Sequence, residues 1–181
     1  DWVEGEALTS LFKRSKRLDI ASFLNIFTQV CEVLTEAHSR NLFHGNLSPD
    51  RISIVTGSIE ADTVKVCDFG MPIDSVQNAF YMSPEQCLDQ SRVDARSDLY
   101  SLGCIMYESL VGRPPSLGTA DLSVDFLHEM ANQYSKDSPE HSAFKLLDCI
   151  IKRCLNRKPT KRFSSARELM SALGLVSDCF D

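Results

Sequence analysis

The stretch from residue 96 to residue 115, RSDLYSLGCIMYESLVGRPP, constrains the fold of this chain more than any other. On a helix it leaves little polar face, because apolar side chains point in most directions: Leu99, Leu102, Ile105, Met106 and Leu110. A helix that is apolar nearly all round must be enclosed by other elements. The sequence therefore predicts a mainly α fold, a helical bundle around one buried central helix.

The rest of the chain supplies elements that can enclose this helix. Apolar residues recur at helical spacing over five ranges: 6–15, 19–40, 122–134, 142–155 and 164–173. Residues 51–55 and 63–67 instead alternate between polar and apolar, and turn residues separate them, so we expect a small β-hairpin there. With 181 residues, 43% of them hydrophobic, the chain can bury a core, and we expect one domain over residues 1–181.

Composition excludes several classes of partner. The net charge of −6 argues against nucleic acid or an anionic membrane as the main partner. The chain has no apolar run long enough to span a bilayer. Its seven cysteines contain no C-x-x-C pair, which favours reduced thiols and a cytoplasmic location; a metal site from Cys149 and Cys154 is a weaker alternative. We therefore expect other proteins as partners.

Four short motifs accompany the central stretch in a fixed order. HGNLSPDRI occupies residues 44–52, Asp-Phe-Gly residues 68–70 and Ser-Pro-Glu residues 83–85, and a Cys-Leu pair at 154–155 precedes Arg162. A lone Asp-Phe-Gly is a weak signal, but the joint order resembles the C-terminal lobe of the protein kinase family. The wording is closest to that of bacterial, eukaryotic-like Ser/Thr kinases. A protein-kinase-like C-lobe is accordingly the expected fold.

The resemblance implies that the catalytic residues have been replaced. Asn46 stands at the position of the family's base aspartate, Ser48 at the position of its lysine, and Arg51 at the position of its metal-binding asparagine. An amide cannot accept a hydroxyl proton as a carboxylate does, and an arginine places a cation where a metal ligand is needed. Each change should cost on the order of 10²-fold in rate, so no catalytic residue is expected to be intact.

Asp68 is the remaining residue that could bind a metal. It could hold Mg²⁺, and through it ATP, only weakly, so no cofactor is expected. The metal-binding positions of the family converge on one small volume. We therefore expect Arg51 to pair directly with Asp68 in place of a metal ion.

Other matched positions imply structural roles. By the resemblance, Asp98 caps the central helix and hydrogen-bonds the backbone of the catalytic loop, and Glu85 forms a buried pair with Arg162. The resemblance also implies structural roles for His44 and Phe69. His38 lies at the end of an apolar helical stripe and is expected to be a packed or capping residue.

Parts of a complete kinase are not found in the sequence. Residues 1–5 resemble a remnant of the hinge, 44–52 are the relic of the catalytic loop, and 68–85 form an unusually short activation segment. The glycine-rich loop, the strand lysine and the helix glutamate of an N-lobe are missing, so we expect the N-lobe to be absent. Gly45 replaces the family's phosphate-binding arginine, and Ser75 is the single serine between Met71 and Met82, so activation by phosphorylation is not expected.

These observations support a pseudokinase that serves as an interaction or regulatory module. The alternative is a Ser/Thr protein kinase domain with weak or unorthodox activity once an N-lobe is present, and a third possibility is an inert remnant. An upstream strand lysine and glycine loop would favour the alternative. The sequence identifies neither the partner nor the pathway.

Overall fold

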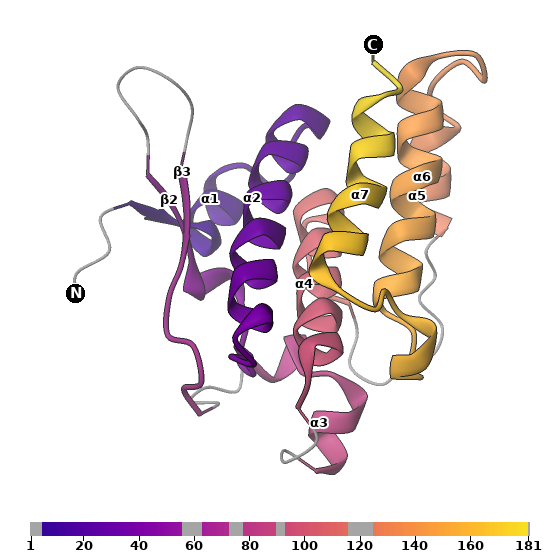
Figure 1. The fold of residues 1–181 in the computed structure, drawn as a ribbon. Helices are drawn as coiled ribbons and strands as arrows, with labels where there is room; N and C mark the ends of the chain where they lie inside the picture. Colours follow the sequence, from indigo (N-terminus) through magenta and orange to yellow (C-terminus); the bar gives the residue numbers. More distant parts are fainter. Residues whose placement is uncertain (1–4, 56–62, 73–77, 90–92, 116–124, 181) are drawn as a thin grey trace.

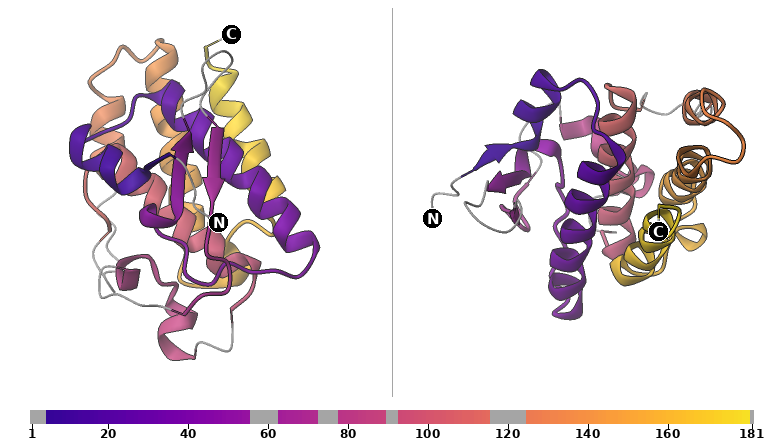
Figure 2. Two further views of the ribbon diagram at one scale, coloured as in Figure 1. Left: turned by 90° about the vertical axis from the view of Figure 1, so that its left-hand side faces the viewer. Right: turned by 90° about the horizontal axis from the view of Figure 1, so that it is seen from above.

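The computed structural model describes residues 5–55, 63–72, 78–89, 93–115 and 125–180. A small sheet lies at one side of the molecule and the helices form the rest (Figure 1). From the sheet outward the order is α2, then α4, then α6 and α7, and the view from above keeps this order (Figure 2). The fold is therefore a helical bundle with a sheet on one flank, as predicted.

The predicted central helix is α4 (Ala95–Val111). Its apolar residues are almost completely buried, which confirms the expectation: Leu99, Leu102, Ile105 and Met106 at 0% exposed and Leu110 at 3%. Asp94 caps its first turn by accepting a hydrogen bond from the Arg96 N–H at 2.7 Å. The helix ends at Gly112, whose φ of 86° places it in the left-handed region that glycine adopts without strain.

Gly103 explains how closely α4 packs against α6 (Pro139–Cys154). A Cβ atom added at this glycine would lie 2.5 Å from the Cβ of Cys154, which is closer than two carbon atoms can approach. The absence of a side chain therefore lets the two helices meet. This contact fixes the outer helices on the central one.

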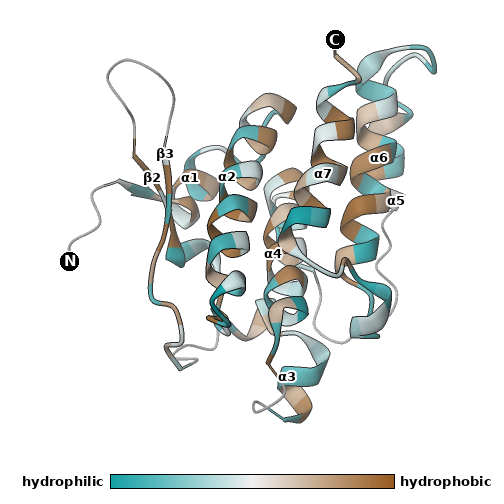
Figure 3. Cartoon of the chain, in the orientation of Figure 1, coloured by the Kyte–Doolittle hydropathy of each residue, from teal (hydrophilic) through white to brown (hydrophobic). Residues whose placement is uncertain are grey.

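The long helix α2 (Ile20–Ser39) covers the other side of α4. Asp19 is its N-cap, as expected, and accepts a hydrogen bond from the Ser22 N–H at 2.8 Å. Polar and apolar residues alternate around the helices, and the apolar ones form the shared core (Figure 3). The core is thus continuous from the sheet to the outermost helices.

The remaining helices differ from the predicted ranges mainly at their ends. Helix α6 begins earlier than the predicted residue 142 because Ser138 caps it and Pro139 occupies its first turn. Helix α7 (Ala166–Ser177) continues beyond residue 173, since Val176 extends its buried stripe. The helix predicted over 122–134 is α5 (Asp125–Ala131), and residues 122–124 lie outside the described part.

The predicted hairpin is present, and a further strand joins it. Within the described residues β1 (Glu6–Ala7), β2 (Ile52–Val55) and β3 (Thr63–Val66) form an antiparallel sheet in the order β1-β2-β3. The helix predicted from residue 6 was wrong at its start, because Glu6 pairs with Ile54 and α1 (Leu8–Arg14) begins only afterwards. Backbone pairing with a distant strand overrides the local helical pattern here.

Short helical turns connect these elements: η1 (Pro49–Arg51), η2 (Asn78–Tyr81), α3 (Pro84–Leu88) and η4 (Pro159–Lys161). In the described part of the chain, no helix is long and apolar enough to cross a membrane. The hinge assigned to residues 1–5 lies outside the described residues except for Gly5, and Ser75 lies outside them as well.

Candidate functional site

The relic of the catalytic loop (residues 44–52) follows α2, contains η1 and is anchored on the carboxylate of Asp98. The backbone N–H groups of His44 and Gly45 donate to Asp98 Oδ2 and Oδ1, each at 2.8 Å. Asp98 is 1% exposed and lies in the first turn of α4. The buried central helix therefore positions the loop, as the resemblance implied. The capping role that the resemblance implied for Asp98 was wrong, because Asp94 is the N-cap of α4 and Asp98 lies inside its first turn.

His38 supports the same carboxylate, a role that the sequence did not reveal. Its Nε2 atom lies 2.8 Å from Asp98 Oδ2, and its ring packs near Phe43 with ring centres 5.8 Å apart. His38 is thus a packed residue in the last turn of α2, as expected. Its place at the end of the apolar stripe was the one available signal for a buried polar contact.

The ring of His44 packs against Phe69, with centroids 4.7 Å apart. Burial lowers the pKa of His44, because removal from water disfavours the charged imidazolium. A neutral ring at this position packs against an aromatic neighbour without an unpaired charge. The loop that contains Asp68 and Phe69 is thereby fixed against the relic of the catalytic loop.

Arg51 and Asp68 form the direct pair that the sequence predicted. Arg51 Nη1 donates to Asp68 Oδ2 at 2.5 Å. The arginine side chain is 9% exposed and that of Asp68 52% exposed, so the cation lies inside and the carboxylate reaches toward it from the surface. The prediction of an ion pair at this point is confirmed.

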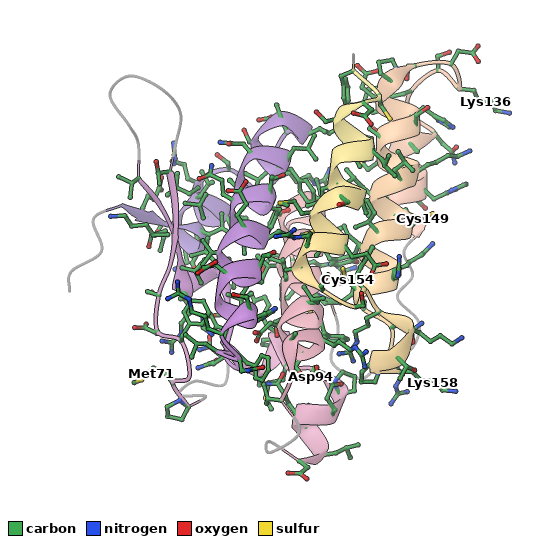
Figure 4. The ribbon with its side chains drawn as sticks, viewed as in Figure 1. Met71, Asp94, Lys136, Cys149, Cys154 and Lys158 are labelled. Atoms are coloured by element: carbon green, nitrogen blue, oxygen red, sulfur yellow. The ribbon has the colours of Figure 1, made fainter. Side chains whose placement is uncertain are left out.

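This arrangement does not fit a magnesium ion. Magnesium in proteins binds oxygen ligands, whereas here a guanidinium that is always charged contacts the carboxylate. Among the described residues, no group of three or more His, Cys, Asp or Glu side chains is placed to hold a metal ion. Cys149, the exposed half of the alternative cysteine site, and the buried Cys154 lie at separate places on α6 (Figure 4).

Asn46 and Ser48, at the positions of the base and the lysine, are both buried. The side-chain N–H of Asn46 donates to the carbonyl of Pro72 at 2.8 Å. Within the described residues the hydroxyl of Ser48 has no hydrogen-bond partner. No sequence signal indicates the Asn46 contact, because its acceptor is a backbone carbonyl.

Glu85 and Arg162 form the expected buried pair. Arg162 donates from Nη1 to Glu85 Oε1 at 2.6 Å and from Nη2 to Oε2 at 2.8 Å. The Arg162 side chain is 0% exposed and that of Glu85 13% exposed. Burial would raise the pKa of Glu85, but hydrogen bonds from Arg162, the backbone and Ser97 outweigh it and lower the pKa.

A surface pocket of about 410 Å³ adjoins the relic, whose first two residues, His44 and Gly45, help to line it. Residues 41–45, residues 70–72, Gln86 and Val93 line it. Leu42 is 47% exposed and Met71 53% exposed, and Figure 4 shows Met71 at the foot of the strand layer. A Cβ atom added at Gly45 would lie 3.7 Å from Val93 Cγ1, which is ordinary van der Waals contact.

Comparison with known proteins decides the family. The profile of the protein kinase domain matches residues 1–173. This chain belongs to the protein kinase family. Serine/threonine-protein kinase PknB of Mycobacterium leprae is 30% identical over 185 aligned positions, which cover 96% of this chain and 29% of that protein. Serine/threonine-protein kinase Pkn1 of Myxococcus xanthus is 33% identical over 168 positions, covering 86% of this chain and 24% of that protein.

Solved structures agree with the expected fold. A crystal structure of the Mycobacterium tuberculosis PknI kinase domain superposes with a TM-score of 0.74 and 26% identity, covering 98% of this chain and 64% of that one. The chain thus spans less than a third of the curated relatives and about two thirds of a solved kinase domain. The prediction of a kinase C-lobe-like fold, similar to bacterial Ser/Thr kinases, is confirmed.

Proposed function

We propose that this protein-kinase-like domain is catalytically impaired and acts as an interaction or regulatory module. The single observation that carries the proposal is the set of contacts made by the substituted residues. Asn46 and Arg51 each bind the segment that follows β3, and neither is free to take part in phosphoryl transfer. Residues at catalytic positions have become structural contacts.

The loss of chemistry follows from the groups present. Asn46 donates its amide hydrogen to a carbonyl and offers no carboxylate to accept the proton of a substrate hydroxyl. Ser48 carries no charge to stabilise a transferring phosphoryl group. Several such losses in one site act together, so restoring one group should not restore the reaction.

The frame around the site remains ordered. Asp98 still holds the backbone of the loop, Phe69 still packs on His44, and Glu85 still pairs with Arg162. A domain that keeps this frame presents a fixed surface, which suits recognition by another protein. The net charge of −6 supports a protein partner over nucleic acid.

A phosphoryl-transfer assay tests the proposal. The chain, and the longest natural form that contains it, would be incubated with Mg²⁺ and ATP labelled on its γ-phosphate. We expect no label on the protein or on a generic protein substrate above a heat-denatured control, and the single change Asn46→Asp should not alter this. An active Ser/Thr kinase domain serves as the positive control.

The longest natural form also tests the alternative function. If that form transfers phosphate while the chain alone does not, a weak or unorthodox Ser/Thr kinase becomes the better description. Transfer by the chain itself would overturn the proposal directly.

A further inference from the structure

Besides the packing of His44 on Phe69, three hydrogen bonds between described residues tie residues 68–72 to the relic of the catalytic loop. The N–H of Gly70 donates to the carbonyl of His44 at 3.0 Å, which any sequence could provide. The other two depend on side chains: Asn46 Nδ2 to the carbonyl of Pro72 at 2.8 Å and Arg51 Nη1 to Asp68 Oδ2 at 2.5 Å. Both side chains stand at positions where the catalytic residues of the family would be.

The contact of Asn46 requires an amide. The carbonyl of Pro72 can only accept a hydrogen bond, so its partner must donate one. A carboxylate at position 46 has no hydrogen to donate at neutral pH. Its negative charge would face the carbonyl oxygen at a site that is 5% exposed. Asn46, which stands in place of the base aspartate, is therefore also the residue that makes the hydrogen bond to Pro72 possible.

The backbone conformation of Asp68 gives a further reason why residues 68–72 need support from their surroundings. Its φ of 62° is in the left-handed region, which is uncommon for a residue other than glycine. Conformations of this kind persist where the surroundings hold them. Arg51 holds the side chain of Asp68, and the packing of Phe69 on His44 holds the next residue.

We propose that Asn46 and Arg51 form a clamp that fixes residues 68–72 in one conformation without nucleotide or metal. The two residues act from opposite ends of the segment, one on Pro72 and one on Asp68. Residues 70–72 form part of the wall of the 410 Å³ pocket, so the clamp also fixes that part of the wall. The proposed function rests on the same two contacts, but the clamp concerns the conformation of residues 68–72 and not phosphoryl transfer, so the two are tested by different measurements.

Hydrogen exchange of the Gly70 and Met71 amides in the full chain tests the clamp. The Gly70 amide donates to the carbonyl of His44 in the relic, and the Met71 amide donates to the carbonyl of Asp68 within the clamped segment. We expect Asn46→Asp to lower their protection on the order of tenfold, while the amides in the middle of α4 keep theirs. Asn132→Asp makes the same charge change at an exposed position and should leave all of these amides unchanged.

The pH dependence adds a signature that a general loss of packing would not give. A protonated carboxyl carries an O–H that can donate to the Pro72 carbonyl. The protection of Gly70 and Met71 in Asn46→Asp, relative to the unaltered chain at each pH, should therefore recover as the pH falls through the pKa of the introduced carboxyl.

Further variants keep the test decisive. Asn46→Ala removes the donor without adding charge, and it replaces Asn46→Asp if the latter does not fold. Arg51→Gln should lower protection of the same two amides. Unchanged protection in Asn46→Ala, or equal loss across the amides of α4, would overturn the clamp.

Discussion

Removal of Glu85 should destabilise the fold far more than the loss of an ordinary surface ion pair. In Glu85→Ala the guanidinium of Arg162 would keep its bonds to the carbonyls of Arg96 and Asn156 but lose both carboxylate bonds. Its side chain is 0% exposed, so water cannot replace them without rearrangement. A cation would remain buried without its counter-charge.

The size of the effect follows from this burial. Breaking a buried pair from one side costs about 3–5 kcal/mol, whereas an exposed pair contributes about 0–1 kcal/mol. The hydroxyl of Ser97 would also lose its acceptor, Glu85 Oε1, at 2.9 Å. We therefore expect Glu85→Ala to lower the free energy of unfolding by about 3–5 kcal/mol.

Urea denaturation followed by circular dichroism measures this change. The matched control is Glu36→Ala, which removes the carboxylate of a pair with Arg40 whose side chains are 65% and 74% exposed. The control should change the free energy of unfolding by less than about 1 kcal/mol. Similar changes of a few tenths of a kcal/mol in both variants would refute the reasoning.

The same pair predicts a pH dependence. The pKa of Glu85 is lowered in the folded protein, so its contribution is complete above the unfolded pKa of about 4.3 and is lost as the pH falls through the folded value. The difference in stability between the unaltered chain and Glu85→Ala should therefore shrink below about pH 4. A difference that grows on acidification would contradict the assigned direction of the shift.

Three further changes test the frame around the site by urea denaturation. Gly103→Ala should cost about 1–3 kcal/mol, because its methyl group would collide with Cys154, and no loss would count against the close contact of α4 and α6. Asp98→Asn should cost about 1.5–3 kcal/mol, since the buried carboxylate that accepts bonds from His44, Gly45 and His38 becomes an amide with a single acceptor oxygen; a neutral result would show that the loop is held elsewhere. Asp19→Ala should cost about 1 kcal/mol through the lost N-cap of α2, and a cost near zero would mean that packing alone fixes the start of this helix.

The sequence predicts the central helix because its apolar residues leave few alternatives. Burial on all sides follows from the residue types of α4 themselves, and the alternation of β2 and β3 indicates a hairpin in the same way. The predicted start of α1 was wrong because Glu6 and Ala7 pair with a strand more than 40 residues further along the chain. Such pairing leaves no mark in the local pattern of residues.

The contacts of the site were likewise predictable only in part. The family resemblance placed Arg51 beside Asp68 and Glu85 beside Arg162, because both partners of each pair lie at positions matched to the motifs. The bond from Asn46 to Pro72 has a backbone acceptor, and every residue has a carbonyl. Its partner could be found only from the path of the chain.

The direct test of the central claim is the melting temperature of the chain with and without magnesium and ATP. A ligand that binds the folded state raises the melting temperature, and the rise grows with its concentration. Because Arg51 already contacts Asp68, we predict no magnesium-dependent rise for the unaltered chain, alone or with ATP. A clear magnesium-dependent rise would show that a metal displaces the arginine, and would contradict the replacement of the metal by Arg51 in favour of residual nucleotide binding.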